Sequence, residues 1–86
     1  MVRKSLHFIK QIGNYEPMKH IREQLNFFME KANCSAAQLA RESGVNAVYI
    51  SRVRRGVRKD IASSSADALR EAMYRIDYET AKQAMA

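Results

Sequence analysis

Glycine, proline and cysteine are scarce in this sequence. Three glycines and one proline among 86 residues leave few obligatory chain breaks, which favours helices over a turn-rich all-β fold. The longest apolar stretch falls far short of the roughly 20 residues that span a bilayer. No apolar run with a small-residue cleavage site follows the charged first residues, Met-Val-Arg-Lys-Ser. We therefore expect a helical protein of the cytoplasm, with neither a membrane span nor a secretion signal.

Residue patterns that support catalysis or metal binding are also absent. Cys34 is the single cysteine, so it can form no internal disulfide and has no second thiol for a metal site. No His or Asp is placed to activate it as a nucleophile, and we interpret it as a small residue near a helix start. His7 and His20 lack the short spacing of metal ligands, and we expect both at the surface or an interface. With no paired carboxylates, triad or glycine-rich phosphate loop, the sequence predicts no enzyme, no metal and no cofactor.

Size and charge are the informative properties of the composition. Hydrophobic residues make up 47% of the 86 residues, enough for one domain around one modest core. Most of the net charge of +6 lies in residues 52–59, a stretch without acidic residues that ends before Asp60. The positively charged residues of this stretch are Arg52, Arg54, Arg55, Arg58 and Lys59. A concentrated patch of one sign is typical of a phosphate-binding surface, although membrane surfaces and acidic proteins also attract such patches.

The first thirteen residues fit two interpretations, and the choice between them stays open. Ser5 can cap a short helix that ends at Gly13, with apolar residues along one side. An alternation of apolar and polar residues over the same segment also fits a strand. Arg3 and Lys4 form either an arm in a DNA minor groove or part of a frayed, solvated terminus.

An amphipathic helix is predicted from about Tyr15 to Lys31. Its apolar residues recur at steps of three and four, namely Met18, Ile21, Leu25, Phe28, Met29 and Ala32. Asn14 can cap this helix, and Pro17 is tolerated in its first turn because the missing N–H has no helical partner there. Phe27 lies off the apolar stripe, so either the N-terminal segment covers it or it faces another protein.

Two short helices joined by a tight turn are predicted next. Ser35 is a good N-cap residue for the first helix, Ala36 to Glu42, which points Leu39 and Ala40 inward. Gly44 supplies the positive φ that a sharp turn between helices requires. Ala40 is small enough to let the two helices pack closely at a steep angle.

The second helix of this pair starts after Asn46, a good N-cap residue, and stops at Gly56. Val45 before the cap and Ile50 after it form a hydrophobic staple that fixes the angle at which the chain enters the helix. With Ile50 and Val53 inward, the opposite face carries Ala47, Val48, Ser51, Arg52 and Arg55. An exposed valine beside arginines is unusual on a solvated face, but it suits contact with thymine methyl groups in a major groove.

The remaining residues are predicted to complete a helical bundle. Beyond a loop from Val57 to Ala62, Ser63 or Ser64 can cap another helix, whose apolar stripe is Ala66, Leu69, Met73 and Ile76. Residues 78–85 either continue this helix or form a separate terminal turn, with Asp77 as the weak point. We therefore expect an all-α, compact bundle of four to five helices, with an extension at 1–13, the main domain at 14–76 and a C-terminal extension at 77–86.

Residues 44–56 carry a recognisable motif. Their sequence, Gly-Val-Asn-Ala-Val-Tyr-Ile-Ser-Arg-Val-Arg-Arg-Gly, closely resembles the Gly-Val-Ser-x-x-Tyr-Ile-Ser-Arg-Ile-Glu-Arg-Gly signature of the phage repressor/Cro (xenobiotic-response-element) helix-turn-helix family. Residues 35–40 resemble the Ser-Gln-x-x-Leu-Ala start of the preceding helix in that family. The resemblance implies a lambda-repressor-like fold and a homodimeric transcriptional regulator, typically a repressor, that binds double-stranded operator DNA and is associated with the nucleoid.

Carried over by position, the resemblance also implies how the second helix meets DNA. Residues 47–54 would enter the major groove, with Ala47, Val48, Ser51 and Arg52 towards the bases. Arg52 is our first choice for reading a guanine. The phosphate contacts expected are Ser35, Asn46, Tyr49, Arg54, Arg55, Arg58 and Lys59.

Two positions depart from the family pattern. The glutamine that follows the capping serine is Ala36 here, so a usual phosphate contact is missing. The glutamate near the end of the second helix is Arg54, and its usual basic partner in an earlier helix corresponds to Met29. Because that pair is commonly a partly buried ion bridge, Arg54 must either extend into solvent or find an acid such as Glu30. Without the bridge, Arg54 becomes an extra candidate for a phosphate contact.

A protein-binding module is the alternative function. Many small proteins of this type pair with a toxin or another regulator and bind DNA partly to control their own synthesis. Phe27, the N-terminal apolar residues and the pair Tyr74 and Tyr78 form either the surface for such a partner or the interface of a homodimer.

Overall fold

Residues 15–57 and 60–86 are described in the computed structural model of the chain. In chain order they form β1 (Tyr15–Pro17), α2 (Met18–Lys31), α3 (Ala36–Ser43), α4 (Ala47–Arg55), β2 (Asp60–Ala62), α5 (Ser63–Ile76) and α6 (Tyr78–Met85). Most of these residues are helical, which confirms the expected class apart from two short strands. The alternatives for residues 1–13 and the predicted cap Asn14 lie outside the described residues.

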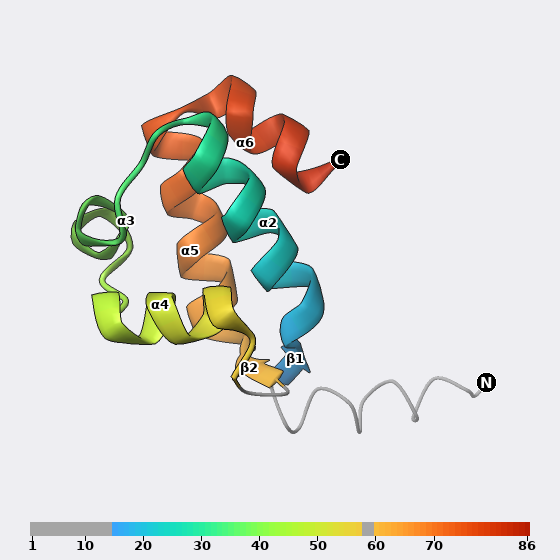
Figure 1. Cartoon of the computed structure of the whole chain (residues 1–86). Coiled ribbons are helices and arrows are strands. Elements are labelled where there is room, and N and C mark those ends of the chain that lie inside the picture. The colour runs from blue at the N-terminus through green and yellow to red at the C-terminus, as the bar shows by residue number, and fades with distance from the viewer. Residues whose placement is uncertain (1–14, 58–59) are drawn as a thin grey trace.

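The helices surround one core (Figure 1). α2 and α5 lie side by side, α6 packs against both, α3 packs on α5, and α4 packs on α2. α4 and α6 therefore lie at opposite ends of the α2–α5 pair. Every helix buries apolar side chains completely. The largest fully buried side chains, of which Ile61 belongs to β2 and the others to helices, are Phe28, Ile21, Leu25, Leu39, Ile50, Ile61, Leu69, Met73 and Val53. The predicted apolar stripes of the helices are thus confirmed where side chains are described, and no polar or charged residue within those ranges is buried.

The ends of the helices follow local sequence signals. Ser35 Oγ accepts a hydrogen bond of 3.1 Å from the Gln38 N–H, and Asn46 Oδ1 accepts one of 2.7 Å from the Val48 N–H. Both predicted N-caps are therefore confirmed. α2 ends at Lys31, and Asn33, two residues further on, adopts φ 54° while the N–H of Cys34 donates to the Met29 carbonyl at 3.0 Å. This is the bond pattern of a Schellman cap with asparagine in the left-handed position.

A two-stranded antiparallel ribbon corrects two expectations. Tyr15 was expected to begin a helix and residues 57–62 to form a loop, but Tyr15 pairs with Ala62, and Pro17 with Asp60. Pro17 disfavours the helical conformation in the residue before it, so the helix begins only at Met18. The ribbon also directs the side chain of Ile61 into the core, where it is fully buried.

The start of α5 differs from the prediction as well. Ser63 and Ser64 were expected to cap this helix, but both lie inside it, and the N-cap position is Ala62 with no side-chain capping bond. Because Ala62 is held in the ribbon, the chain passes directly from strand to helix. At the other end of α5, Asp77 separates α6 as a helix of its own, since Asp77 Oδ1 accepts a 3.2 Å bond from the Thr80 N–H.

Candidate nucleic-acid interface

The two faces of α4 differ sharply in burial. Ile50 and Val53 are fully buried, as predicted, whereas the side chain of Val48 is 58% exposed. Arg52 and Arg55 are exposed beside it, and Ala47 and Ser51 are half-buried. The face expected to meet DNA bases is therefore the outward face of α4, and its predicted members lie together on it.

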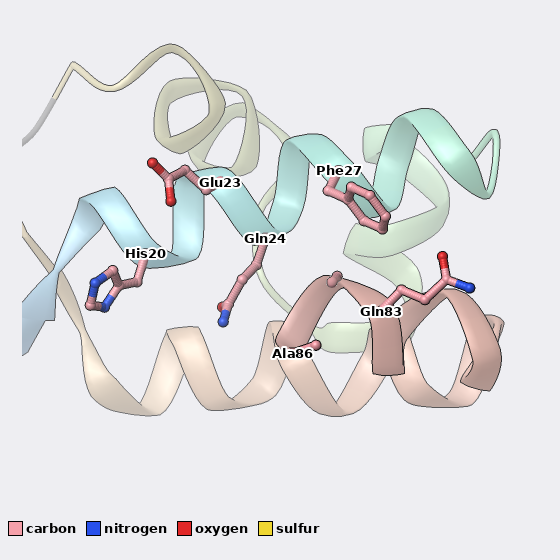
Figure 2. A pocket seen from close by; sticks show the side chains of 7 residues that line it. His20, Glu23, Gln24, Phe27, Gln83 and Ala86 are labelled. Carbon is pink, nitrogen blue, oxygen red and sulfur yellow. The ribbon is translucent and has the colours of Figure 1, made fainter.

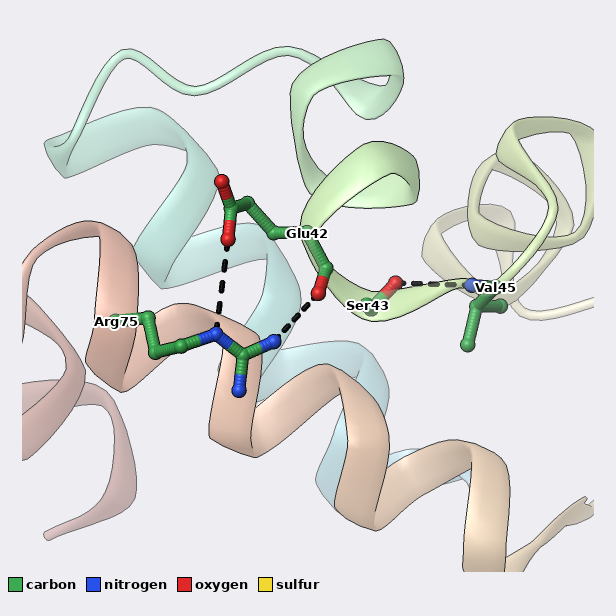
Figure 3. Close-up of polar contacts among 4 residues, drawn as sticks. All are labelled: Glu42, Ser43, Val45 and Arg75. Carbon is green, nitrogen blue, oxygen red and sulfur yellow. Dashed lines mark hydrogen bonds and ion pairs between the residues drawn. The ribbon is translucent and has the colours of Figure 1, made fainter.

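A short turn sets the direction of α4. Gly44 ends α3 with φ 80°, and its N–H donates to the Ala40 carbonyl at 2.8 Å. In this turn the Val45 N–H donates to Ser43 Oγ at 3.1 Å (Figure 3). The positive φ is the conformation that glycine adopts without a steric penalty, which confirms the predicted role of Gly44.

Arg75 of α5 holds the end of α3 just before that turn (Figure 3). Its Nε lies 3.6 Å from Glu42 Oε1, and its Nη2 donates to the Glu42 carbonyl. Both side chains are about half exposed, so the ion pair itself contributes little to stability. The contact nevertheless gives one carbonyl at the C-terminal end of α3 a cationic donor, which suits the partial negative charge at that end of a helix.

Arg54 has a partner that the sequence analysis did not foresee. Its Nε donates to Asn26 Oδ1 at 2.7 Å, and Asn26 Nδ2 donates to the Arg54 carbonyl at 3.4 Å. The expected acidic partner, such as Glu30, is therefore replaced by an amide, and Arg54 is half-buried at the edge of an open depression. The Asn26 amide on α2 accepts from the Nε–H of the guanidinium, while Met29, the position that the resemblance assigns to a basic partner, is in the core at 4% exposure.

Arg22 is a second α2 residue at this end of α4. A β-carbon built on Gly56 would overlap Arg22 Nη1 and lie 3.2 Å from Arg22 Cδ, so the guanidinium lies directly against the glycine. Gly56 has φ 71° and ends α4 as predicted. Sequence reasoning missed both Arg22 and Asn26, although they stand four positions apart along one edge of the apolar stripe of α2 and are half-buried.

A depression of about 300 Å³ lies where α2 meets the end of α4. It is lined by Asn26, Ser51, Arg54 and Arg55. All four side chains carry hydrogen-bond donors, and none of them is acidic. This chemistry favours an anionic ligand over a neutral or cationic one.

The other predicted phosphate contacts are more scattered. Asn46 stands at the start of α4, and Tyr49 is half-buried and packs against the core. Ser35 stands at the N-terminal end of α3, an eight-residue helix, and is therefore about 12 Å from the turn at its C-terminal end. The Ser35 hydroxyl already caps α3. Arg58 and Lys59, like Arg3 and Lys4 of the predicted arm, lie outside the described residues.

A second depression, of about 340 Å³, lies along the contact between α2 and α6 (Figure 2). Phe27 is 36% exposed and points from α2 towards α6, near Gln83. Lys31 Nζ lies 5.9 Å from the centre of the Phe27 ring. His20 is exposed at the rim of the same depression, which confirms a surface position. The residue off the apolar stripe thus faces the C-terminal helix.

Cys34 is buried, and burial raises the pKa of its thiol. A neutral, inaccessible thiol is a poor nucleophile, in agreement with the structural role expected for it. Across residues 15–57 and 60–86, no three His, Cys, Asp or Glu side chains are grouped so that they could hold a metal ion. Within the same ranges, no helix has both the length and the apolar character to cross a membrane.

Comparison with known proteins adds no relative. No protein-family model, curated protein or solved structure matches this chain. The resemblance to the repressor/Cro signature therefore depends on residues 35–40 and 44–56 alone.

Proposed function

We propose that this chain is a sequence-specific, double-stranded DNA-binding transcriptional regulator, a homodimeric repressor of phage or bacterial type. In this proposal α3 and α4 form a lambda-repressor-like helix-turn-helix, and residues 47–54 of α4 enter the major groove. The observation that carries the proposal is the outward face of α4, where Val48 is 58% exposed beside Arg52 while Ile50 behind it is fully buried. Such a protein would act in the cytoplasm, at the nucleoid.

The chemistry of that face matches the edges of base pairs. Arg52 can donate two hydrogen bonds to O6 and N7 of a guanine, and Val48 can pack against a thymine methyl group. Ala47 is small enough to allow the helix backbone to approach the bases, and the Ser51 hydroxyl can donate a hydrogen bond to a base edge in the major groove or accept one from it. Phosphate contacts from Asn46, Tyr49, Arg54, Arg55, Arg58, Lys59 and Ser35, with Arg3 and Lys4 as an arm, would set the register on the duplex.

Selection of binding sites from a pool of random duplexes tests this function. We expect a defined sequence, with two half-sites if the protein binds as a dimer. Arg52→Ala should then weaken binding to the selected duplex by about 1–3 kcal/mol and relax the preference at one base pair. Lys82→Ala, on α6 at the opposite end of the molecule, is the control and should leave the sequence preference unchanged. Equal losses on selected and random duplexes with Arg52→Ala would exclude base reading by this residue.

A protein-binding module of antitoxin type is the second candidate. Tyr78 is 59% exposed and contacts Tyr74, their ring centres lying 5.5 Å apart. Together with Phe27, these rings offer aromatic surface of the kind enriched at protein interfaces. Recovery of a stoichiometric partner from the native host would favour this candidate, whereas retention of one short DNA sequence without such a partner would favour the regulator.

A further inference from the structure

Asn26 holds the guanidinium of Arg54 in one orientation. The bond from Arg54 Nε to Asn26 Oδ1 is 2.7 Å long, and the return bond from Asn26 Nδ2 to the Arg54 carbonyl is 3.4 Å. The first bond uses the Nε–H, whereas the four N–H groups on the two terminal nitrogens are not involved in either bond. A guanidinium fixed in this way loses less side-chain entropy when it binds a ligand.

The surroundings of this pair are those of an anion site. Arg54 and Arg55 follow Ser51 by three and four residues, so both lie next to Ser51 on the surface of α4. Together with Asn26 these three residues line the depression. The depression therefore combines two guanidiniums, an amide and a hydroxyl with no carboxylate among its lining residues. Arg22, which lies against Gly56, adds a third cation nearby.

The position of the depression explains why several cations are needed there. It lies at the C-terminal end of α4, where the helix dipole presents a partial negative charge of about half an elementary charge. A phosphate bound at this end is opposed by that dipole and needs positive side chains to offset it. The three side chains of the last turn that carry charge are Arg52, Arg54 and Arg55.

We propose that Asn26, Ser51, Arg54 and Arg55 form a binding site for a phosphate group of the DNA backbone, with Asn26 positioning Arg54. This inference rests on the proposed function and deepens it in two ways. It assigns DNA contact to a residue of α2, and it makes Ser51 a phosphate ligand as well as a member of the base-facing surface.

The structure offers a matched pair of variants to test this site. Asn26→Asp keeps the shape of the side chain and retains an acceptor for Arg54, but it places a negative charge in the depression. Gln24→Glu makes the same amide-to-carboxylate change opposite another arginine, since Arg70 Nε donates to Gln24 Oε1 at 2.9 Å. Gln24 belongs to the depression between α2 and α6, outside the proposed site.

Binding of the selected duplex, measured over a range of salt concentrations, separates the two variants. We expect Asn26→Asp to weaken binding at least tenfold and to make the dependence of log K on log salt shallower by about one unit, the effect of losing one phosphate. Gln24→Glu should stay within about twofold of the parent, with the same slope. Arg54→Gln, which leaves Asn26 in place, should reproduce the shallower slope if the first variant folds poorly. Equal behaviour of Asn26→Asp and Gln24→Glu would overturn the site.

A titration with inorganic phosphate distinguishes failure of this site from failure of the proposed function. We expect saturable shifts of the Arg54 Nε–H resonance in the parent and in Gln24→Glu, and their loss in Asn26→Asp. These shifts would support the phosphate site even if no duplex sequence were selected, an outcome that would reject the DNA-reading function. Absence of the shifts in the parent would overturn the site, whatever duplex binding is observed.

Discussion

Val48 and Ile50 stand two positions apart on α4. Shortening the side chain of Ile50 should lower stability, whereas shortening that of Val48 should weaken DNA binding. Ile50 is fully buried, so Ile50→Val removes one methylene from a packed core and should lower the free energy of unfolding by about 0.5–1.5 kcal/mol. Val48 is 58% exposed, so Val48→Ala should change that free energy by no more than about 0.5 kcal/mol. Urea denaturation, with unchanged m-values, measures both effects.

DNA affinity should show the opposite ranking. If Val48 packs against a thymine methyl group, Val48→Ala removes two carbons from that contact. At about 0.8 kcal/mol for each carbon, the dissociation constant of the selected duplex should rise roughly fifteenfold. Ile50→Val leaves the outward face of α4 unchanged and should bind within about twofold of the parent, provided that both proteins are folded at the assay temperature. Binding is measured by fluorescence anisotropy on the selected duplex and on the same duplex with the contacted thymine replaced by uracil, which lacks the methyl group.

The uracil duplex supplies the control for this prediction. The parent should lose about as much affinity from the missing methyl group as Val48→Ala loses from its shortened side chain, and the two losses should not add. Val48→Ala could instead weaken binding to both duplexes by the same factor, or lower the free energy of unfolding as much as Ile50→Val does. Either result would refute the assignment of Val48 to the base-facing surface.

Further predictions concern the turns, the ribbon and the thiol. Gly44→Ala should lower the free energy of unfolding by about 1–2 kcal/mol in urea denaturation, because φ is positive there, although the new β-carbon would meet no atom within 4 Å beyond its neighbours in the chain. Gly56→Ala should cost more and also weaken duplex binding, since it displaces Arg22. Ile61→Ala should cost about 2–5 kcal/mol by the same assay, because this strand side chain is fully buried. The raised pKa of the Cys34 thiol predicts that stability falls as pH rises above the ordinary thiol pKa, where the unfolded chain ionises first; Cys34→Ala should remove this part of the pH dependence.

Local signals in the sequence predicted most of the helical framework. The caps at Ser35 and Asn46, the left-handed glycines at Gly44 and Gly56 and the apolar spacing each depend on residues a few positions apart, so they can be recognised without tertiary structure. The outward face of α4 follows from the same spacing once Ile50 is known to point inward.

The features that were missed depend on contacts between distant parts of the chain. Asn26 meets Arg54 only because α2 packs against α4, and neither residue signals the other in the sequence. The strands β1 and β2 have three residues each, too few to show an alternating pattern. Ser63 and Ser64 looked like caps because their chemistry fits, but the ribbon had already set the position at which α5 begins.

The ribbon has a consequence for the order in which this chain folds. It joins Tyr15 to Ala62, two residues far apart in the sequence, whereas α3 and α4 are connected by a few residues. Closing the longer loop costs more chain entropy, and three-residue strands return few hydrogen bonds for it. We therefore expect the strands to pair only after α2, α3 and α4 have assembled, and the ribbon to open first when the native protein fluctuates. Amide hydrogens of β1 and β2 should then exchange with solvent sooner than those of the α2–α5 core, while the packing of α4 on α2 stays intact.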